Sequence, residues 1–185
     1  MQIFQNVSNI IFVIIVLSLN SCETATKSID STGEYYFYSP KKSGTVQIWD
    51  FEQIVMENGN YLNLELVLNE PLTNNNIDTL LLRLPAHLDE ASLINKEDEI
   101  KEKYQTYCKV NNVNYKIRFF IKNNNSIHDE ESIIVYGEGI GLLRLDNIHF
   151  RTSLKLNRSS KLQYESILYL HEKIEEIVRL QVLDN

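Results

Sequence analysis

Apolar and polar residues alternate over several short stretches of the chain, and this alternation predicts a protein made mainly of β-strands. In the segment 62–68, leucine occupies every second position. The segment 113–121 likewise has Val, Tyr, Ile, Phe and Ile at alternate positions. Because successive side chains of a strand point to opposite faces, a period of two places these apolar residues on one buried face.

Turn residues separate the strand-like segments. Pro40 and Pro85 end two of them, and Asn58-Gly59 and Asn111-Asn112 are typical of hairpin turns. Short strands joined mostly by hairpins favour an antiparallel sheet that curls or closes. The predicted strands are 35–38, 45–56, 62–68, 77–84, 104–110, 113–122, 132–136, 142–146 and 148–156.

Two segments depart from this pattern. Residues 86–103 are rich in Asp, Glu and Lys, which suggests a short exposed helix or a mobile loop with a solvated face. Residues 160–170 alternate like a strand, whereas apolar residues from Ile167 onward follow helical spacing, and Ser160 with Gln163 matches a capping box. We expect a late strand that runs into a C-terminal helix. The fold class is mainly β with one or two helices, as a curved half-barrel or small barrel.

The N-terminal region carries a different signal. An apolar run at 10–19 is about half as long as a bilayer-spanning helix, which is the length of a signal-peptide core. It ends in Leu19-Asn20-Ser21-Cys22. This arrangement resembles a bacterial lipoprotein signal peptide with its lipobox, although residues 1–9 contain no Lys or Arg. A short uncleaved anchor and a core helix are the alternatives.

The lipoprotein resemblance implies that Cys22 becomes the new N-terminus and carries acyl chains. It divides the chain into a signal peptide (1–21), a flexible polar tether (22–33) and a single β-rich domain (34–185). The expected location is the bacterial cell envelope, with the protein held to a membrane through its lipid anchor. Two or three acyl chains, as in that family, would make the attachment essentially permanent.

Charge and cysteine content narrow the function classes. The net charge of −7 gives no electrostatic basis for binding nucleic acid, so we expect no such partner. If Cys22 is acylated, Cys108 has no partner within the chain, and its strand-like surroundings predict a buried thiol that acts as a small apolar residue.

Three glycines, Gly137, Gly139 and Gly141, lie within five residues between two apolar strands. A phosphate-binding loop would need a following helix, so we interpret them as a structural tight turn or bulge. The stretch beginning at Tyr136 also resembles a short turn in curved-sheet envelope lipoproteins of the lipoprotein-carrier type. That resemblance implies a curved sheet.

No catalytic or metal-binding signature emerges. The four histidines, His87, His128, His149 and His171, lack metal-ligand spacing, and no cofactor is expected. Trp49 and the ten tyrosines could line an apolar cleft, although aromatic residues in strands are more often core.

The sequence therefore favours a membrane-tethered envelope lipoprotein that acts as a non-enzymatic binding or assembly module. The alternatives are an inhibitor or immunity lipoprotein directed against a cationic enzyme, and a hydrolase with dispersed catalytic residues. A deep apolar cavity would favour lipid or peptide carriage, and a flat acidic patch would favour inhibition. A pocket with His and carboxylates in hydrogen-bond reach would favour catalysis.

Overall fold

Ten strands form one antiparallel sheet in the computed structural model, which describes residues 29–40, 46–58, 60–69, 77–86, 91–93, 98–124 and 131–182. Their order in the sheet is β4-β3-β2-β1-β10-β9-β8-β7-β6-β5. The strands are β1 (Ser31–Tyr38), β2 (Val46–Asn58), β3 (Tyr61–Asn69), β4 (Ile77–Pro85), β5 (Ala91–Leu93), β6 (Asp98–Val110), β7 (Val113–Asn124), β8 (Ser132–Gly137), β9 (Gly141–Asn147) and β10 (Thr152–Ser159). A helix, α2 (Tyr164–Ile177), and a π-helical turn, η1 (Val178–Val182), follow.

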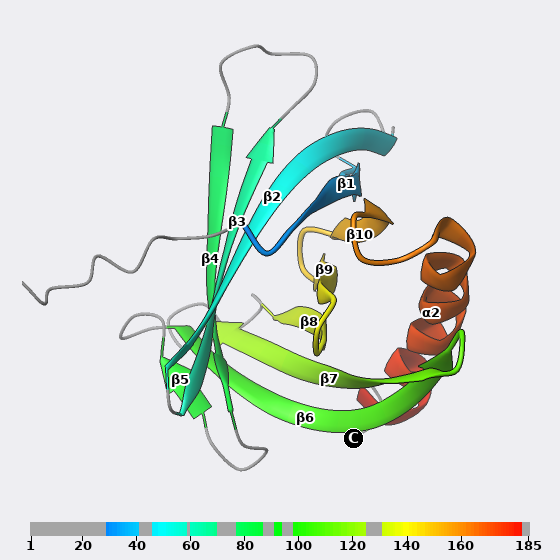
Figure 1. Cartoon of the computed structure of the whole chain (residues 1–185). Helices are drawn as coiled ribbons and strands as arrows, with labels where there is room; N and C mark the ends of the chain where they lie inside the picture. The colour runs from blue at the N-terminus through cyan, green and yellow to red at the C-terminus, as the bar shows by residue number, and fades with distance from the viewer. Residues whose placement is uncertain are drawn as a thin grey trace, which may run out of the picture.

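The sheet curls until its two ends meet. β4, at one end of the strand order, contacts β5 and β6 at the other. Figure 1 shows the resulting barrel, with β2, β3 and β4 on one side and β6 and β7 closing it from below. The predicted antiparallel, curved barrel with a C-terminal helix is confirmed.

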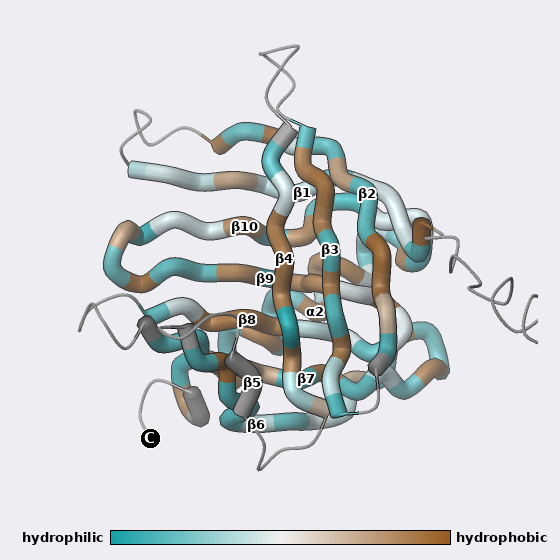
Figure 2. The backbone as a smooth tube through the Cα atoms, turned by 90° about the vertical axis from the view of Figure 1, so that its left-hand side faces the viewer, coloured by the Kyte–Doolittle hydropathy of each residue, from teal (hydrophilic) through white to brown (hydrophobic). Residues whose placement is uncertain are grey.

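The interior of the barrel is filled by alternate residues of each strand. The leucines of β3 all face inward, and Leu64 and Leu66 are almost completely buried. Tyr35 of β1 and Phe120 of β7 add large buried rings from strands that are well separated in the sheet order. Figure 2 shows the same alternation as brown and teal bands along β3.

Helix α2 packs on the outside of the barrel, against the right-hand side in Figure 1. It contacts β10 and β6, which flank β9, β8 and β7 in the sheet. Ile167, Leu170 and Ile174 form its buried face. Because β8 lies between the barrel interior and this helix, all six of its residues are buried. Within the described part of the chain, no helix has the length and apolar character needed to cross a membrane.

The structure corrects the prediction for the charged segment 86–103. Residues 91–93 form β5, and 98–103 begin β6, instead of an exposed helix or loop. Ile100 and Glu102 point into the barrel, whereas Lys101 and Lys103 are exposed. The alternation was hidden because Glu102 is an inward-facing carboxylate, and its charge is balanced inside by Arg118.

The C-terminal prediction was right about the helix and wrong about a strand over 160–170. Helix α2 begins at Tyr164 because the helical spacing of its apolar residues matches a continuous buried surface. Ser160 and Gln163 form no capping box. Gln163 itself is the N-cap residue, and its side chain makes no capping hydrogen bond.

Smaller differences concern strand limits and turns. The predicted strand 148–156 starts later, at Thr152, because residues 148–151 form a turn in which Arg151 has a φ of 52°. β1 begins at Ser31, so residues 31–33 of the expected tether belong to the sheet. The Asn111-Asn112 turn is confirmed, with φ of 48° and 65°.

Candidate functional site

The two ends of the barrel differ in chemistry, and one of them is closed by a buried ion pair. Arg118 of β7 bonds to Glu102 of β6 through Nε (3.0 Å) and Nη2 (2.5 Å). The same Nη2 donates to the carbonyl oxygens of Pro85 (2.6 Å) and Ala86 (3.1 Å) at the end of β4. Both charged side chains are almost fully buried. The guanidinium therefore joins the two ends of the sheet at this end of the barrel.

A bulge between β8 and β9 adds further hydrogen bonds at the same end of the barrel. The register shifts after Val135, which leaves the backbone of Leu142 facing the interior. The Leu142 amide donates to Oε1 of Gln53 (3.0 Å), and the Leu142 carbonyl accepts from the Tyr35 hydroxyl (2.7 Å). Burial raises the pKa of Tyr35 above its ordinary value, so this hydroxyl remains a proton donor in alkaline solution as well as at neutral pH.

The predicted glycine turn joins β8 to β9 at this closed end. Gly137 ends β8, Gly141 begins β9, and Gly139 and Gly141 have φ of 77° and 114°. A β-carbon on Gly139 would meet no atom within 4 Å, whereas one on Gly141 would overlap the side-chain amide of Gln53. The close approach of Gln53 is a constraint that the sequence did not reveal.

The opposite end of the barrel is an open mouth, with a cavity of about 440 Å³. Its walls come from β1 to β4 on one side and from β8 to β10 on the other. Phe37 and Trp49 lie against each other there, with ring centroids 5.0 Å apart. The apolar lining residues are Phe37, Trp49, Leu68, Leu80, Leu145 and Leu154.

Polar side chains surround the mouth. Ser132, Asn147 and Thr152 are direct neighbours across β8, β9 and β10, and the Asn147 amide donates to the Ser132 hydroxyl (3.4 Å). Asp78 approaches from β4 on the facing wall. Among the described residues that line the mouth, Asp78 is the charged one, and none is Lys or Arg. The site combines an apolar interior with hydrogen-bonding groups at its edge.

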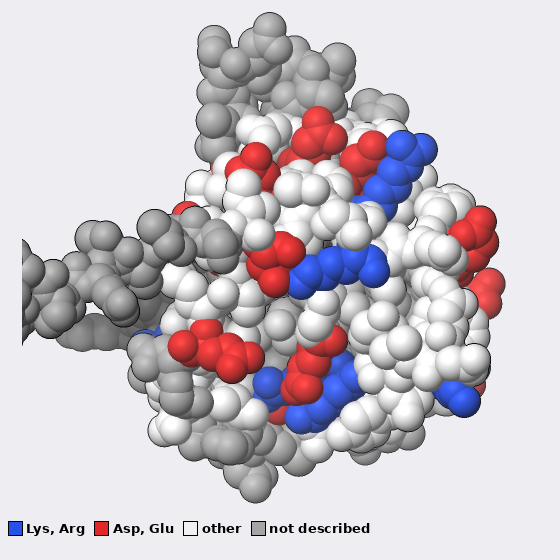
Figure 3. Space-filling model, in the orientation of Figure 1, with Lys and Arg blue, Asp and Glu red and all other residues white. Residues whose placement is uncertain are grey.

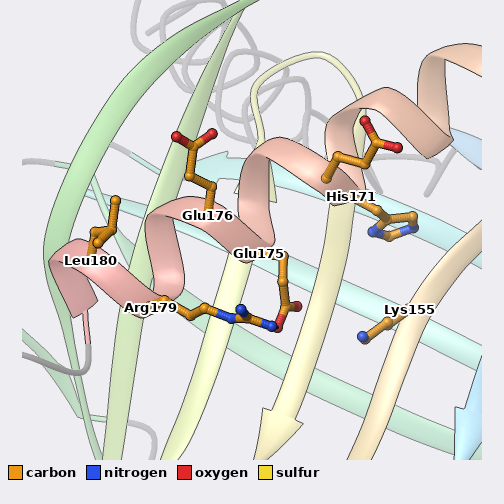
Figure 4. Close-up of a pocket in the computed structure, with 7 residues that line it drawn as sticks. Lys155, His171, Glu175, Glu176, Arg179 and Leu180 are labelled. Carbon is orange, nitrogen blue, oxygen red and sulfur yellow. The ribbon is translucent and has the colours of Figure 1, made fainter.

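A second hollow, of about 660 Å³, runs between α2 and β10 (Figure 4). It contains His171, Lys155 and three glutamates of the helix. His171 Nε2 bonds to the carbonyl oxygen of Leu156 (2.6 Å), which makes this nitrogen the donor. Glu175 accepts from Arg144 (2.5 Å), and this bond lowers the pKa of Glu175.

The histidine of this hollow fastens the helix to the sheet. Burial lowers the pKa of His171, so the imidazole is neutral at pH 7. Its one described hydrogen bond goes to a backbone carbonyl and not to a carboxylate, and its Nδ1 is buried without a hydrogen-bond partner among the described residues. This geometry lacks the carboxylate that orients the base in a catalytic triad.

The remaining residues singled out from the sequence are scattered. Cys22, His87 and His128 lie outside the described residues. Cys108 is a buried free thiol whose pKa is raised by burial, and His149 lies in the β9–β10 turn. Across the ranges that the structure describes, no three His, Cys, Asp or Glu side chains are grouped to hold a metal ion. Trp49 is buried in the core and also lines the mouth, so the structure agrees with both interpretations of this residue from the sequence.

Charge on the visible surface is mixed. On the face shown in Figure 3, Lys and Arg side chains lie among those of Asp and Glu. Among the described residues, Lys161 forms an ion pair with Asp30 at 2.6 Å. This face is therefore not a flat acidic patch.

Comparison of the chain with protein-family models, with curated proteins and with solved structures gives no match.

Replacing Gly141 with alanine should destabilise the protein more than the same change at Gly139. At Gly139 the cost is that of a positive φ, about 1–2 kcal/mol. At Gly141 the displaced Gln53 adds the loss of buried hydrogen bonds, for a total of about 3 kcal/mol or more. Urea unfolding of both variants measures the difference. Equal losses of unfolding free energy would show that Gln53 does not constrain the turn.

Stability should fall as the pH drops below the ordinary pKa of His171. The pKa of His171 lies below 6.5 in the folded protein, and it returns to about 6.5 on unfolding. Between these two values the unfolded chain binds more protons, so acid favours unfolding. His171→Gln should flatten this part of the curve of unfolding free energy against pH. His149→Gln, at an exposed position, is the control for the loss of an imidazole that does not fasten the helix.

Proposed function

We propose that this chain is a lipid-anchored, non-enzymatic protein of the cell envelope that binds the apolar part of a small amphiphile in the mouth of its barrel. The observation that carries the proposal is the cavity lined by Phe37, Trp49 and four leucines. Its volume of about 440 Å³ falls within the range of about 300–1,000 Å³ that is typical of small-molecule sites.

The arrangement of lining groups favours an amphiphile over a wholly apolar or wholly polar ligand. Phe37, Trp49 and Leu154 supply apolar surface that gains from covering a hydrocarbon chain. The hydroxyls and amide at the edge can bond a polar headgroup, as the specificity groups of ligand pockets do. Asp78 favours a neutral or cationic headgroup, because a second negative charge there would be repelled.

The anchor is the second part of the proposal. Acylation of Cys22 would place the β-rich domain beside a membrane, since the fold begins at Ser31. An extended chain from Cys22 to Ser31 reaches about 30 Å. Amphiphiles concentrate in and at membranes, so a tethered module would meet its ligand at high local concentration.

The other two hypotheses have less support. An inhibitor of a cationic enzyme would favour an acidic contact surface, and charges are mixed on the face in Figure 3. A hydrolase would favour a base oriented by a carboxylate, whereas His171 bonds to the carbonyl of Leu156.

Adjacent leucines on β4 provide a matched test of the binding site. Leu80 lines the mouth, and Leu81 points outward with 61% of its surface exposed. Leu80→Arg should weaken binding about tenfold or more, because a charged guanidinium in place of an apolar wall costs more than about 1.4 kcal/mol when a hydrocarbon chain covers it. Leu81→Arg should bind as the unaltered chain does.

The measurement is fluorescence of the neutral dye 1-N-phenylnaphthylamine and its displacement by lysophosphatidylcholine. It uses the chain from residue 23 onward, because every described contact lies within residues 29–182. Thermal unfolding checks that both arginine variants are folded. Equal dye affinity in folded Leu80→Arg and Leu81→Arg chains would reject the mouth as the binding site.

Cys22→Ala should abolish acylation and leave unprocessed precursor in the membrane fraction. The expectation rests on the Leu19–Cys22 lipobox after the apolar run. Metabolic labelling with a fatty acid, together with the size of the chain on a gel, measures both effects. Normal processing of the alanine variant would contradict the lipoprotein hypothesis.

A further inference from the structure

The outer face of the β1–β2 pair changes in chemistry along its length. Near the closed end, Glu34 lies opposite Asp50, and the neighbouring Glu52 also faces outward. Near the mouth, the paired residues are Tyr36 with Ile48 and Tyr38 with Val46. One strand pair therefore has carboxylates at one end and apolar side chains at the other.

The four residues Tyr36, Tyr38, Val46 and Ile48 form a block that we call the apolar lip. Their exposed fractions are 37%, 39%, 57% and 45%, respectively. Cross-strand neighbours on one face lie about 5 Å apart, so the four side chains make one continuous patch. Contiguous exposed apolar surface of this kind marks a contact site.

The apolar lip is the outer side of the same wall that lines the cavity. Phe37 and Trp49, which alternate with the lip residues along β1 and β2, face the mouth. The β9–β10 turn lies at the same end of the barrel, on the left in Figure 2, and exposes Ile148 and Phe150. Apolar surface thus continues from the inside of the mouth to its outside.

We propose that the apolar lip docks on the surface of a lipid bilayer, so that the mouth of the barrel opens beside the membrane. Tyrosine combines an apolar ring with a hydroxyl and is favoured at the level of lipid headgroups. Two cations lie beside the lip, since Tyr36 pairs with Lys155 and Arg151 lies in the adjoining turn. The carboxylates Glu34 and Asp50 lie two residues farther along the same strands, on the side away from the mouth, and Glu52 follows Asp50.

A bilayer fits this patch better than a second copy of the chain does. A stable protein interface covers about 800 Å² on each partner, which is more than four half-exposed side chains provide. Membrane contact can be weak and still persist, because the anchor proposed at Cys22 holds the domain at the surface. In this respect the inference rests on the proposed function. An extended tether of about 30 Å also exceeds the length of β1, about 23 Å, so the lip can turn back to the anchoring membrane.

Hydroxyl-radical footprinting of the full chain in phosphatidylcholine vesicles tests the docking. Tyr38 on the lip and Tyr169 on α2 are 39% and 40% exposed, so they should be oxidised at similar rates if both face water. We expect Tyr36 and Tyr38 to be oxidised several-fold more slowly than Tyr169 on vesicles. Equal oxidation of Tyr38 and Tyr169 in the retained chain would overturn the proposal.

Two variants locate the contact. In Val46→Glu/Ile48→Glu, oxidation of Tyr36 and Tyr38 should rise to the level of Tyr169. Leu81→Glu, on the outer face of β4, should leave the protection in place. Protection that survives the double change, or that grows with the density of protein on the vesicle, would reject a lipid contact, and the second result would indicate self-association.

The footprinting and the dye measurement together separate this inference from the proposed function. Normal dye binding in the mouth with unprotected lip tyrosines would reject docking alone. Protected lip tyrosines without dye binding would reject the amphiphile site and leave the docking intact.

Discussion

Closure of the sheet at one end is the constraint on which the rest of the structure depends. A ten-stranded sheet leaves two edges, and here the β4 edge is joined to β6 and β7 through Arg118. Its guanidinium is shared between Glu102 and the carbonyl groups of Pro85 and Ala86. Burying such a pair is expensive, and removing one partner typically costs about 3–5 kcal/mol. The contact is tolerated because Nε and Nη2 of Arg118 and both carboxylate oxygens of Glu102 have hydrogen-bond partners.

Because only one end of the barrel is closed in this way, its two ends differ in structure. Gln53 and Tyr35 bond to the backbone of Leu142 at the β8–β9 bulge, so polar groups of three strands meet there. At the other end the facing walls separate, and the apolar side chains of β1, β4 and β10 leave a cavity. The candidate site thus lies at the mouth because the sheet is joined through Arg118 at the opposite end of the barrel. The outer face of β1 and β2 also changes along the strands. Its carboxylates lie toward the closed end, and its exposed apolar residues lie toward the mouth.

Much of this fold could be predicted from local patterns. The leucines of β3 and the turn at Asn111-Asn112 have signals within a few residues, and both were identified correctly. The start of β6 was missed because Glu102 reads as a surface residue until its partner Arg118 is known. The mouth was missed for a related reason. Phe37, Leu80 and Leu154 look like ordinary core residues, and only the curvature of the whole sheet decides that they line a cavity. Residues 160–170 carried both a strand and a helix pattern, and packing against β10 and β6 decided between them.

The most direct test of the central claim uses Trp49, the single tryptophan of the chain, as a reporter inside the mouth. Its fluorescence should be quenched by a monoacyl phosphocholine that carries bromine on the acyl chain, because quenching by bromine requires close contact. The account predicts saturable quenching, reversed by excess unbrominated amphiphile of the same chain length. A Trp49 emission that stays unchanged while the protein binds the brominated amphiphile would contradict it.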